Sequence, residues 1–183
     1  QMLTIQIMFI RNERLPREVD YTCLILKMKP SIGLIFILVV LLADCRDSLK
    51  TEAQTIINYG DNKSTGKYLF VNGVNLYYEA YGYGDPLVLL HGNGGNIKGM
   101  KHQIECFSKN YKVITMDCRG RGKSELGSDT LTYMLMTKDV ISLLDHLHLD
   151  SVYVIGRSDG GIIALLMGIY FPEKVKKIAA FGA

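Results

Sequence analysis

The residues of this chain with the clearest potential for chemistry are Gly-Arg-Ser-Asp-Gly at positions 156–160. The apolar run at 152–155 predicts a buried strand before them, and the apolar run at 162–170 predicts a helix after them. Glycines on both sides of Ser158 permit a sharp turn that lifts the hydroxyl above the strand end. The free N–H groups at the start of the helix favour negative charge at the same place. This arrangement suits a nucleophile whose transition state carries an oxyanion, although a glycine-rich turn can also hold a serine by chance.

The composition predicts one globular domain and no nucleic-acid partner. The chain has 183 residues, of which 48% are hydrophobic and 21% are charged, and this is enough for a core of ordinary size. The net charge of +3 is too small and too scattered to favour binding to nucleic acid.

Sequence motifs for a metal or a cofactor are absent. The four cysteines, at positions 23, 45, 106 and 118, form no C-x-x-C pair and no zinc-ligand spacing. Gly122-Lys123-Ser124 is similar to the end of a phosphate-binding loop, but position 117 is aspartate where that loop requires glycine. We therefore expect no cofactor and no metal. A disulfide between Cys106 and Cys118 stays open for an oxidising compartment.

An export signal is predicted near the amino terminus. Residues 32–43 form an apolar run of 12 residues, which is too short to span a bilayer comfortably, where about 18 or more are expected. With two lysines just before it, the run fits the hydrophobic core of a secretory signal. We interpret residues 28–45 as a signal peptide or membrane anchor, with translation starting at Met28. Residues 1–27 are then an upstream segment without an assigned folded role.

The end of the apolar run, Leu-Leu-Ala-Asp-Cys at 41–45, resembles a bacterial lipoprotein processing site. The resemblance implies that Cys45 is lipidated and becomes the first residue of the mature chain, although Asp44 stands where the pattern has a small neutral residue. An uncleaved anchor and a simple secretory signal are the alternatives. We expect an exported protein of the bacterial cell envelope, either periplasmic or attached to the membrane through residues 32–43 or a lipidated Cys45.

The sequence places the folded domain at residues 67–183, after a polar tether at 46–66. An Asn-Gly pair at 72–73 predicts a hairpin between the first two strands of the domain. Strands are predicted at 68–71, 74–81, 87–90, 111–116, 152–155 and 175–181, and helices at 98–109, 132–149 and 162–170.

This order of elements predicts an α/β fold with a mostly parallel sheet and an antiparallel hairpin at its start. Wholly apolar strands that alternate with helices indicate a sheet covered by helices on both faces. Glycine-rich loops follow three of the strands, at 91–95, 117–124 and 156–161. Because the carboxyl ends of parallel strands share one edge, we expect these loops to form the site.

With these loops in this order, residues 68–183 resemble the first part of an α/β-hydrolase of the serine hydrolase and esterase type, truncated after about the sixth strand. His-Gly-Asn-Gly at 91–94 resembles the oxyanion loop of that family. Asp-x-Arg-Gly-x-Gly-x-Ser at 117–124 resembles its second signature loop, and positions 156–160 resemble its nucleophile elbow. The resemblance implies the fold and the elbow but leaves the substrate open.

The resemblance implies that Ser158 is the acylated nucleophile and that the backbone N–H groups of Asn93 and Asp159 form the oxyanion hole. His91 precedes the nucleophile, so we interpret it as a structural residue of its loop. The loop at 117–124 is interpreted as a structural turn. Serine rather than aspartate at the elbow favours hydrolysis of an ester or amide over the epoxide and haloalkane chemistry of the family.

The catalytic residues of the family follow the order Ser, then Asp or Glu, then His, and residues 159–183 contain no histidine. We therefore expect this chain to be the amino-terminal part of a hydrolase, inactive by itself because the serine lacks a base. The expected substrate is a small-molecule ester or amide. The competing hypothesis is a non-catalytic surface lipoprotein that uses the same fold for binding.

Overall fold

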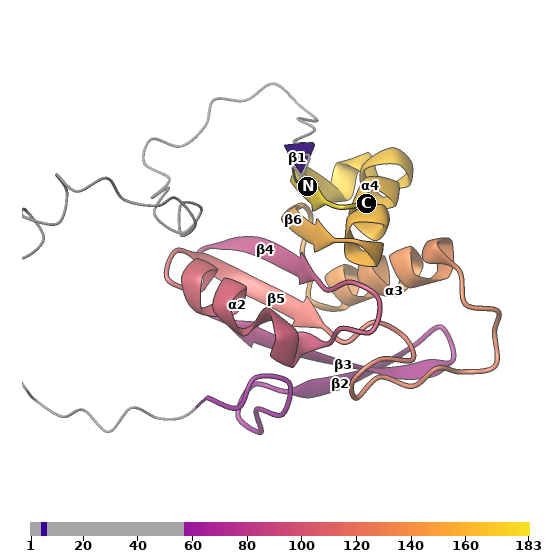
Figure 1. Ribbon diagram of the computed structural model, residues 1–183, viewed down its shortest axis with the longest axis horizontal. Coiled ribbons are helices and arrows are strands. Elements are labelled where there is room, and N and C mark those ends of the chain that lie inside the picture. Colours follow the sequence, from indigo (N-terminus) through magenta and orange to yellow (C-terminus); the bar gives the residue numbers. More distant parts are fainter. Residues whose placement is uncertain (1–4, 7–56) are drawn as a thin grey trace, which may run out of the picture. The chain divides into compact units, whose positions relative to one another are not determined.

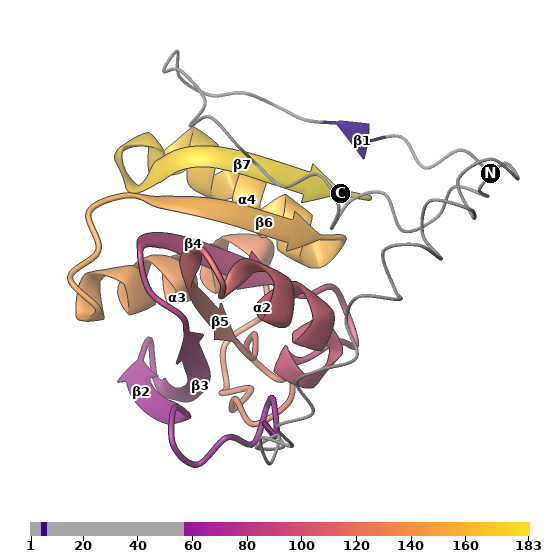
Figure 2. The ribbon, with the colours of Figure 1, turned by 90° about the vertical axis from the view of Figure 1, so that its left-hand side faces the viewer.

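The computed structural model describes residues 5–6 and 57–183, in which helices cover both faces of one mixed sheet (Figure 1, Figure 2). The strands are β1 (Ile5–Gln6), β2 (Lys67–Val71), β3 (Val74–Tyr81), β4 (Asp85–Leu90), β5 (Tyr111–Met116), β6 (Val152–Arg157) and β7 (Val175–Phe181). The helices are α2 (Lys101–Phe107), α3 (Tyr133–His146) and α4 (Asp159–Tyr170), with short 3-10 turns at η2 (Ile97–Met100) and η3 (Pro172–Lys174).

The strand order is β1-β7-β6-β4-β5-β3-β2. Strands β5, β4, β6 and β7 pair in parallel, whereas β2, β3 and β5 pair antiparallel. The predicted mixed sheet with an antiparallel hairpin at its start is confirmed. One strand was not predicted: β1 pairs antiparallel with the end of β7, with Ile5 opposite Phe181 and Gln6 opposite Ala180.

Side-chain alternation along the parallel strands divides the core into two layers. In β4, Leu87 belongs to a cluster with Ile104 of α2, whereas the next residue, Val88, belongs to a cluster with Val140 of α3 and Ile163 of α4. Figure 2 shows α2 on one face of the sheet and α3 and α4 on the other. Each side chain buried in this way contributes roughly 1.5–3 kcal/mol, so both layers anchor the strand ends that carry the site.

The predicted helices are present, but all three have different bounds, and α4 begins at Asp159 rather than at residue 162. Helix α3 begins at Tyr133, where the Thr132 hydroxyl accepts a hydrogen bond from the backbone N–H of Leu135 at 3.1 Å. It ends at His146, before His148 takes a positive φ of 54°. The helix predicted at 98–109 is divided into η2 and α2.

A buried carboxylate extends the folded region towards the amino terminus. Glu79 of β3 has no exposed surface, and it accepts hydrogen bonds from the backbone N–H groups of Gly60 and Asn62 and from the hydroxyls of Tyr77 and Tyr81, at 2.7–2.9 Å. A buried carboxylate requires such donors. Residues 58–66 are therefore part of the packed domain rather than of the tether predicted at 46–66.

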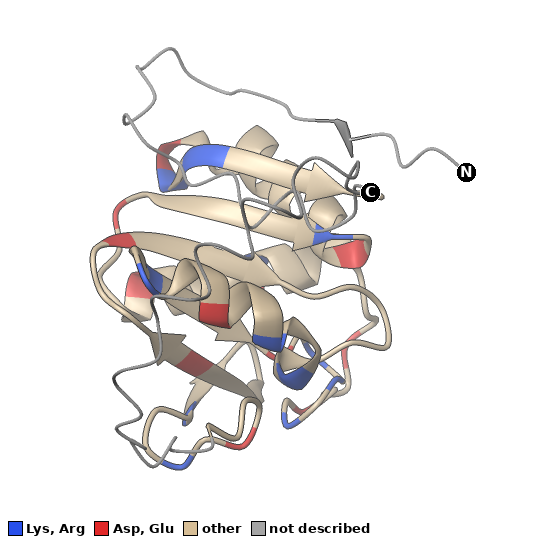
Figure 3. Cartoon of the chain, turned by 60° about the vertical axis from the view of Figure 1, so that its left-hand side comes forward, with Lys and Arg blue, Asp and Glu red and all other residues tan. Residues whose placement is uncertain are grey.

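Elsewhere, Lys, Arg, Asp and Glu are interspersed over loops, helices and strand ends (Figure 3). The predicted signal segment at 28–45, with Cys45, and most of the predicted tether lie outside the described residues. In the part of the chain that the structure describes, no helix is both long and apolar enough to cross a membrane.

Candidate active site

Ser158 lies in the turn between β6 and α4 with an unusual backbone conformation. Its φ is 51° and its ψ is −120°, in the half of conformational space that non-glycine residues rarely enter. The Ser158 N–H donates to the carbonyl of Phe181 at 2.8 Å, and the Ser158 carbonyl accepts from the N–H of Ile162 at 3.0 Å. The end of β7 and the first turn of α4 thus hold a conformation that costs of order 1–3 kcal/mol.

The glycines on either side of Ser158 are required by close backbone contacts. A Cβ atom on Gly156 would lie 2.1 Å from the carbonyl oxygen of Gly160. A Cβ atom on Gly160 would lie 2.3 Å from the carbonyl oxygen of Leu90, at the end of β4. Real Cβ atoms do not approach so closely, so the sharp turn and its seat on β4 both depend on these two glycines.

The loop after β4 packs directly against the elbow. A Cβ atom on Gly92 would lie 3.1 Å from the Cβ of Ser158, which places Asn93 beside the nucleophile candidate. Asp159 begins α4, where backbone N–H groups have no helical partner. Within residues 57–183, the backbone N–H groups of Asn93 and Asp159 donate no hydrogen bond. One of these N–H groups belongs to the residue after Ser158, and the other belongs to the loop that packs against Ser158 through Gly92.

His91 is held as a structural residue, as the sequence indicated. Its side chain is 3% exposed, and its Nε2 accepts a hydrogen bond from the backbone N–H of Cys118 at 3.0 Å. A backbone N–H can only donate, so Nε2 is unprotonated and the ring proton is on Nδ1, which donates to the carbonyl of Gly92 at 2.8 Å. With both nitrogens engaged, the ring cannot accept the proton of Ser158.

The other histidines of the chain do not contact Ser158 either. His102 is an exposed partner of Glu105, with 3.8 Å between His Nδ1 and a carboxylate oxygen. His146 packs edge-on against Tyr78, with ring centroids 6.5 Å apart. His148 lies in the turn that follows α3. No histidine among the described residues is thus placed as a base.

The loop at 117–124 is a structural turn around Asp117, as predicted. The Asp117 carboxylate is 1% exposed and accepts from the backbone N–H groups of Ile97 and Lys123, each at 2.8 Å. Burial raises the pKa of this carboxyl, against the lowering effect of the two N–H donors. The Ser124 hydroxyl donates to the Asp117 carbonyl at 2.6 Å and accepts from the N–H of Tyr77 at 2.8 Å. The turn therefore fixes the loops after β4 and β5 relative to each other.

A buried ion pair fastens the same loop to α3. The Arg119 guanidinium donates to both carboxylate oxygens of Asp139, from Nε at 2.9 Å and from Nη2 at 2.8 Å. Both side chains are 1% exposed, and the hydrogen bond to Asp139 raises the pKa of Arg119 further. Arg119 Nη2 also reaches the carbonyl of Asn72, so the pair links three segments that are distant in the sequence.

Two polar contacts beside Ser158 were not predicted. Arg121 Nη2 donates to the side-chain oxygen of Asn93 at 2.5 Å, and the Tyr133 hydroxyl donates to Asp159 Oδ1 at 3.1 Å. The hydrogen bond from Tyr133 to Asp159 raises the pKa of the tyrosine. The only sequence signal was that Arg121 lies within the loop at 117–124. Because that whole loop was interpreted as a structural turn, Arg121 was given no role of its own.

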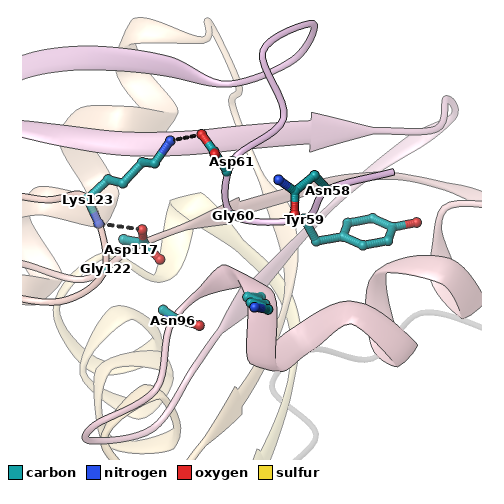
Figure 4. Close-up of a pocket in the computed structure, with 9 residues that line it drawn as sticks. Asn58, Tyr59, Gly60, Asp61, Asn96, Asp117, Gly122 and Lys123 are labelled. Atoms are coloured by element: carbon teal, nitrogen blue, oxygen red, sulfur yellow. Dashed lines mark hydrogen bonds and ion pairs between the residues drawn. The ribbon is translucent and has the colours of Figure 1, made fainter. Parts of the chain in front are cut away.

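A polar cavity of about 280 Å³ lies away from the elbow, between residues 58–61 and the loops after β4 and β5 (Figure 4). Ser158, Asn93 and Asp159 do not line it. Lys123 pairs with Asp61, and the Lys123 N–H is bonded to Asp117 (Figure 4), whereas Lys98 is exposed to solvent. We therefore place the candidate chemistry at Ser158 and not in this cavity.

A second cavity of about 20 Å³, roughly the size of one water molecule, lies at the elbow itself. Its lining combines the two loops with apolar groups of α3 and α4: His91, Gly92, Asn93, Cys118, Arg119, Arg121, Leu131, Met136, Asp159 and Ile163.

The described region holds a free cysteine, Cys118, and no candidate metal site. Cys118 is a free, buried thiol, so the disulfide considered between Cys106 and Cys118 does not form. Within residues 57–183, no group of three or more His, Cys, Asp or Glu side chains could hold a metal ion.

Residues 85–183 match the family model of the alpha/beta hydrolase fold, which is more than half of the chain. The chain belongs to the α/β-hydrolase family. The predicted fold and the predicted resemblance to the α/β-hydrolase family are both confirmed. The match includes the three glycine-rich loops at 91–95, 117–124 and 156–161.

Relatives in this family are hydrolases with several kinds of substrate. The chain is 38% identical over 114 residues to an sn-1-specific diacylglycerol lipase of Danio rerio, covering 57% of this chain and 34% of the lipase. It is 32% identical over 126 residues to epoxide hydrolase 4 of Mus musculus, covering 64% and 35%. The solved structure of Est816, an N-acyl homoserine lactone degrading enzyme, superposes with a TM-score of 0.58 at 33% identity, covering 60% and 42%.

The chain therefore spans less than half the length of the α/β-hydrolases that it resembles. These relatives support a hydrolase of this fold. The relatives act on different substrates, namely an epoxide, a diacylglycerol and an N-acyl homoserine lactone, so they do not identify the bond that this protein cleaves.

Proposed function

We propose that the complete protein is a serine hydrolase that cleaves an ester or amide through an acyl intermediate on Ser158. One observation carries the proposal: Ser158 has a positive φ at the turn into α4, and the loop that holds Asn93 packs against it through Gly92. Strain that the surrounding contacts hold in place is typical of functional sites. The N–H groups of Asn93 and Asp159 donate to no group among residues 57–183, so both are proposed as oxyanion donors, each of which contributes about 3 kcal/mol in related enzymes.

In the proposed reaction, Ser158 Oγ attacks the carbonyl carbon of the substrate while a base takes the hydroxyl proton. The carbonyl oxygen becomes an oxyanion that accepts hydrogen bonds from Asn93 and Asp159. The amino end of α4 adds its positive dipole at the same point. Departure of the alcohol or amine leaves an ester on Ser158, and water then releases the acid.

The base and its acid partner are assigned to a part of the complete protein that follows residue 183. The support is the chain order of the family, in which both come after the nucleophile, and the engagement of His91 with Gly92 and Cys118. The 183-residue chain alone is accordingly proposed to be inactive, because an unassisted serine hydroxyl is a weak nucleophile.

The identity of residue 158 separates ester from epoxide chemistry. Opening an epoxide with a serine would leave an alkyl ether on the enzyme, which water does not cleave under mild conditions. Acyl transfer to the same serine leaves an ester, which water can hydrolyse. A small-molecule ester or amide is therefore the proposed substrate, although epoxide hydrolases are among the relatives.

The proposal is tested by hydrolysis of 4-nitrophenyl acetate by the protein expressed from its complete gene. The variant Ser158→Ala is expected to lose at least about 10³-fold in kcat, because the acyl acceptor is removed. Ser151→Ala is the matched control, since Ser151 lies outside the turn, just before β6, and should retain activity.

Activity that survives Ser158→Ala would rule out Ser158 as the nucleophile. A folded complete protein without activity towards any ester or amide would favour the alternative, a non-catalytic surface lipoprotein that binds a ligand with this fold.

We also propose that the protein is exported to the bacterial cell envelope, where it is either periplasmic or attached to the membrane through residues 32–43 or a lipidated Cys45. The proposal rests on the sequence of residues 28–45 alone. Mass spectrometry of the mature amino terminus tests it: a diacylated cysteine peptide starting at Cys45 supports lipidation. A mature protein that retains peptides from residues 12–26 would contradict the start at Met28.

A further inference from the structure

The loop at 117–124 carries three positive side chains, and two of them have carboxylate partners. Arg119 is buried against Asp139, with Nη2 and Oδ1 2.8 Å apart. Lys123 forms an ion pair with Asp61 and lies over the ring of Tyr77. These two cations are neutralised within the domain and have structural roles.

Arg121, the third cation of the loop, has no such partner. Its Nη1 donates to the carbonyl of Gly120 at 3.0 Å, and its Nη2 donates to the side-chain oxygen of Asn93 at 2.5 Å. Among the described residues, no carboxylate lies within ion-pair distance of it. A guanidinium has five N–H donors in a planar fork that matches a carboxylate. The Arg121 charge therefore has no carboxylate partner among the described residues, and three of its five N–H groups are not used in these hydrogen bonds.

The contact with Asn93 fixes this charge beside the proposed reaction centre. Arg121, Asn93 and Asp159 line the same small cavity at the elbow. Asp159 is the carboxylate of that cavity, but its Oδ1 is bonded to the Tyr133 hydroxyl and it forms no ion pair with Arg121. A substrate whose carbonyl oxygen lies at Asn93 and Asp159 thus has a guanidinium next to it.

We propose that Arg121 selects substrates with a carboxylate close to the scissile ester or amide, and binds that carboxylate through its unused N–H groups. The proposal rests on the proposed function of Ser158 and adds the substrate class. Arg157, immediately before Ser158, is exposed and adds positive charge at the same edge of the sheet.

The competing role for Arg121 is positioning only. The hydrogen bond to Asn93 steadies a loop with glycines at positions 92, 94 and 95, and with it an oxyanion donor. A positioning role would lower kcat for every substrate by the same factor. Selection of a carboxylate would instead change the ratio between an anionic and a neutral substrate, mainly through KM.

The experiment measures kcat/KM of the complete protein for 4-nitrophenyl acetate and for the mono-4-nitrophenyl ester of glutaric acid. We expect the parent to prefer the anionic ester in kcat/KM. This preference should fall about tenfold or more in Arg121→Gln, which is the effect expected from losing one hydrogen-bonded charge pair. Lys98→Gln is the matched control, because it removes an exposed positive charge that lines only the larger polar cavity. Its ratio should stay within about twofold of the parent, since exposed charges act weakly.

An unchanged ratio in Arg121→Gln would overturn the proposal, even if both rates fall together. A complete protein that turns over neither ester would count against the proposed function of Ser158 instead. Arg121 is then judged by calorimetric titration of glutarate. Binding that weakens about tenfold in a folded Arg121→Gln variant supports the anion site, and equal or absent binding in both proteins refutes it.

Discussion

At the scale of single residues, the turn that holds the proposed nucleophile requires glycine on both sides of Ser158, because a side chain at either position would collide with the backbone. Gly156 and Gly160 lack the Cβ atoms that would collide with backbone carbonyl groups, and Ser158 takes the strained position between them. The sequence predicted this turn correctly because glycines at these positions have a direct steric meaning. It did not predict the hydrogen bond from Ser158 to Phe181, because β7 joins the site only after folding.

The first prediction concerns Gly160→Ala. The new Cβ would lie 2.3 Å from the Leu90 carbonyl oxygen and 2.7 Å from that of His91, and a backbone atom cannot move aside cheaply. We expect a loss of about 3 kcal/mol or more in the free energy of unfolding, at the upper end of overpacking effects. Urea denaturation followed by circular dichroism measures it.

Gly99→Ala is the matched control for this prediction, because a Cβ there has no neighbour within 4 Å. It should change stability by less than about 0.5 kcal/mol, as most surface substitutions do. Equal losses in the two variants would show that the contact with β4 is not what requires glycine at position 160.

The second prediction concerns the thiol of Cys118. Burial, with nearby carboxylates as a smaller cause, raises its pKa from 9.0 to about 12. We expect iodoacetamide at pH 8 to leave Cys118 unmodified in the folded protein and to alkylate it in urea, as read by peptide mass spectrometry. Between pH 9 and 12 the unfolded state releases a proton that the folded state keeps, so this group lowers stability as pH rises. Rapid alkylation of the folded protein would contradict the buried thiol.

At the scale of elements, the site is built where the carboxyl ends of three parallel strands meet. The parallel strands were predictable as short, wholly apolar runs, and the helices as longer apolar or amphipathic stretches between them. The contacts that loops make with other elements were not predictable. Arg119 bonds to Asp139 of α3, and Gly60 bonds to Glu79 of β3, across about 20 residues of sequence with no local pattern joining the partners.

The third prediction concerns the link between the loop at 117–124 and α3. Arg119→Met removes one partner of the buried pair and leaves the Asp139 carboxylate without its cation. We expect a loss of about 3–5 kcal/mol in the free energy of unfolding. Thermal and urea denaturation of the folded variant measure the loss.

Lys176→Met is the control for this comparison, because Lys176 and Asp85 form an ion pair that is partly exposed to solvent. Exposed pairs contribute about 0–1 kcal/mol, so this variant should stay close to the parent. A similar small loss for Arg119→Met would mean that the ion pair does not hold the loop.

At the scale of the whole molecule, the fold and the family were predictable and the chemistry was only partly so. Three glycine-rich loops in a fixed order led to the α/β-hydrolase family, and residues 85–183 match its family model. The short pairing of β1 with β7 was missed because it links the two ends of the chain through only two residues. The substrate was not predictable from the sequence. The proposed carboxylate class depends on the position of Arg121 beside Asn93, and only the folded structure shows that contact.

The central claim is that Ser158 becomes an activated nucleophile in the complete protein. Labelling with a fluorophosphonate, followed by tryptic digestion and mass spectrometry, tests it most directly, because cleavage after Arg157 and Lys174 releases Ser158 in one peptide. We expect a single phosphonylated serine, at position 158, in the complete protein, and no labelling of that serine in the 183-residue chain. An intact, folded complete protein that carries no adduct, or carries it on a different serine, would show that Ser158 is not the activated nucleophile.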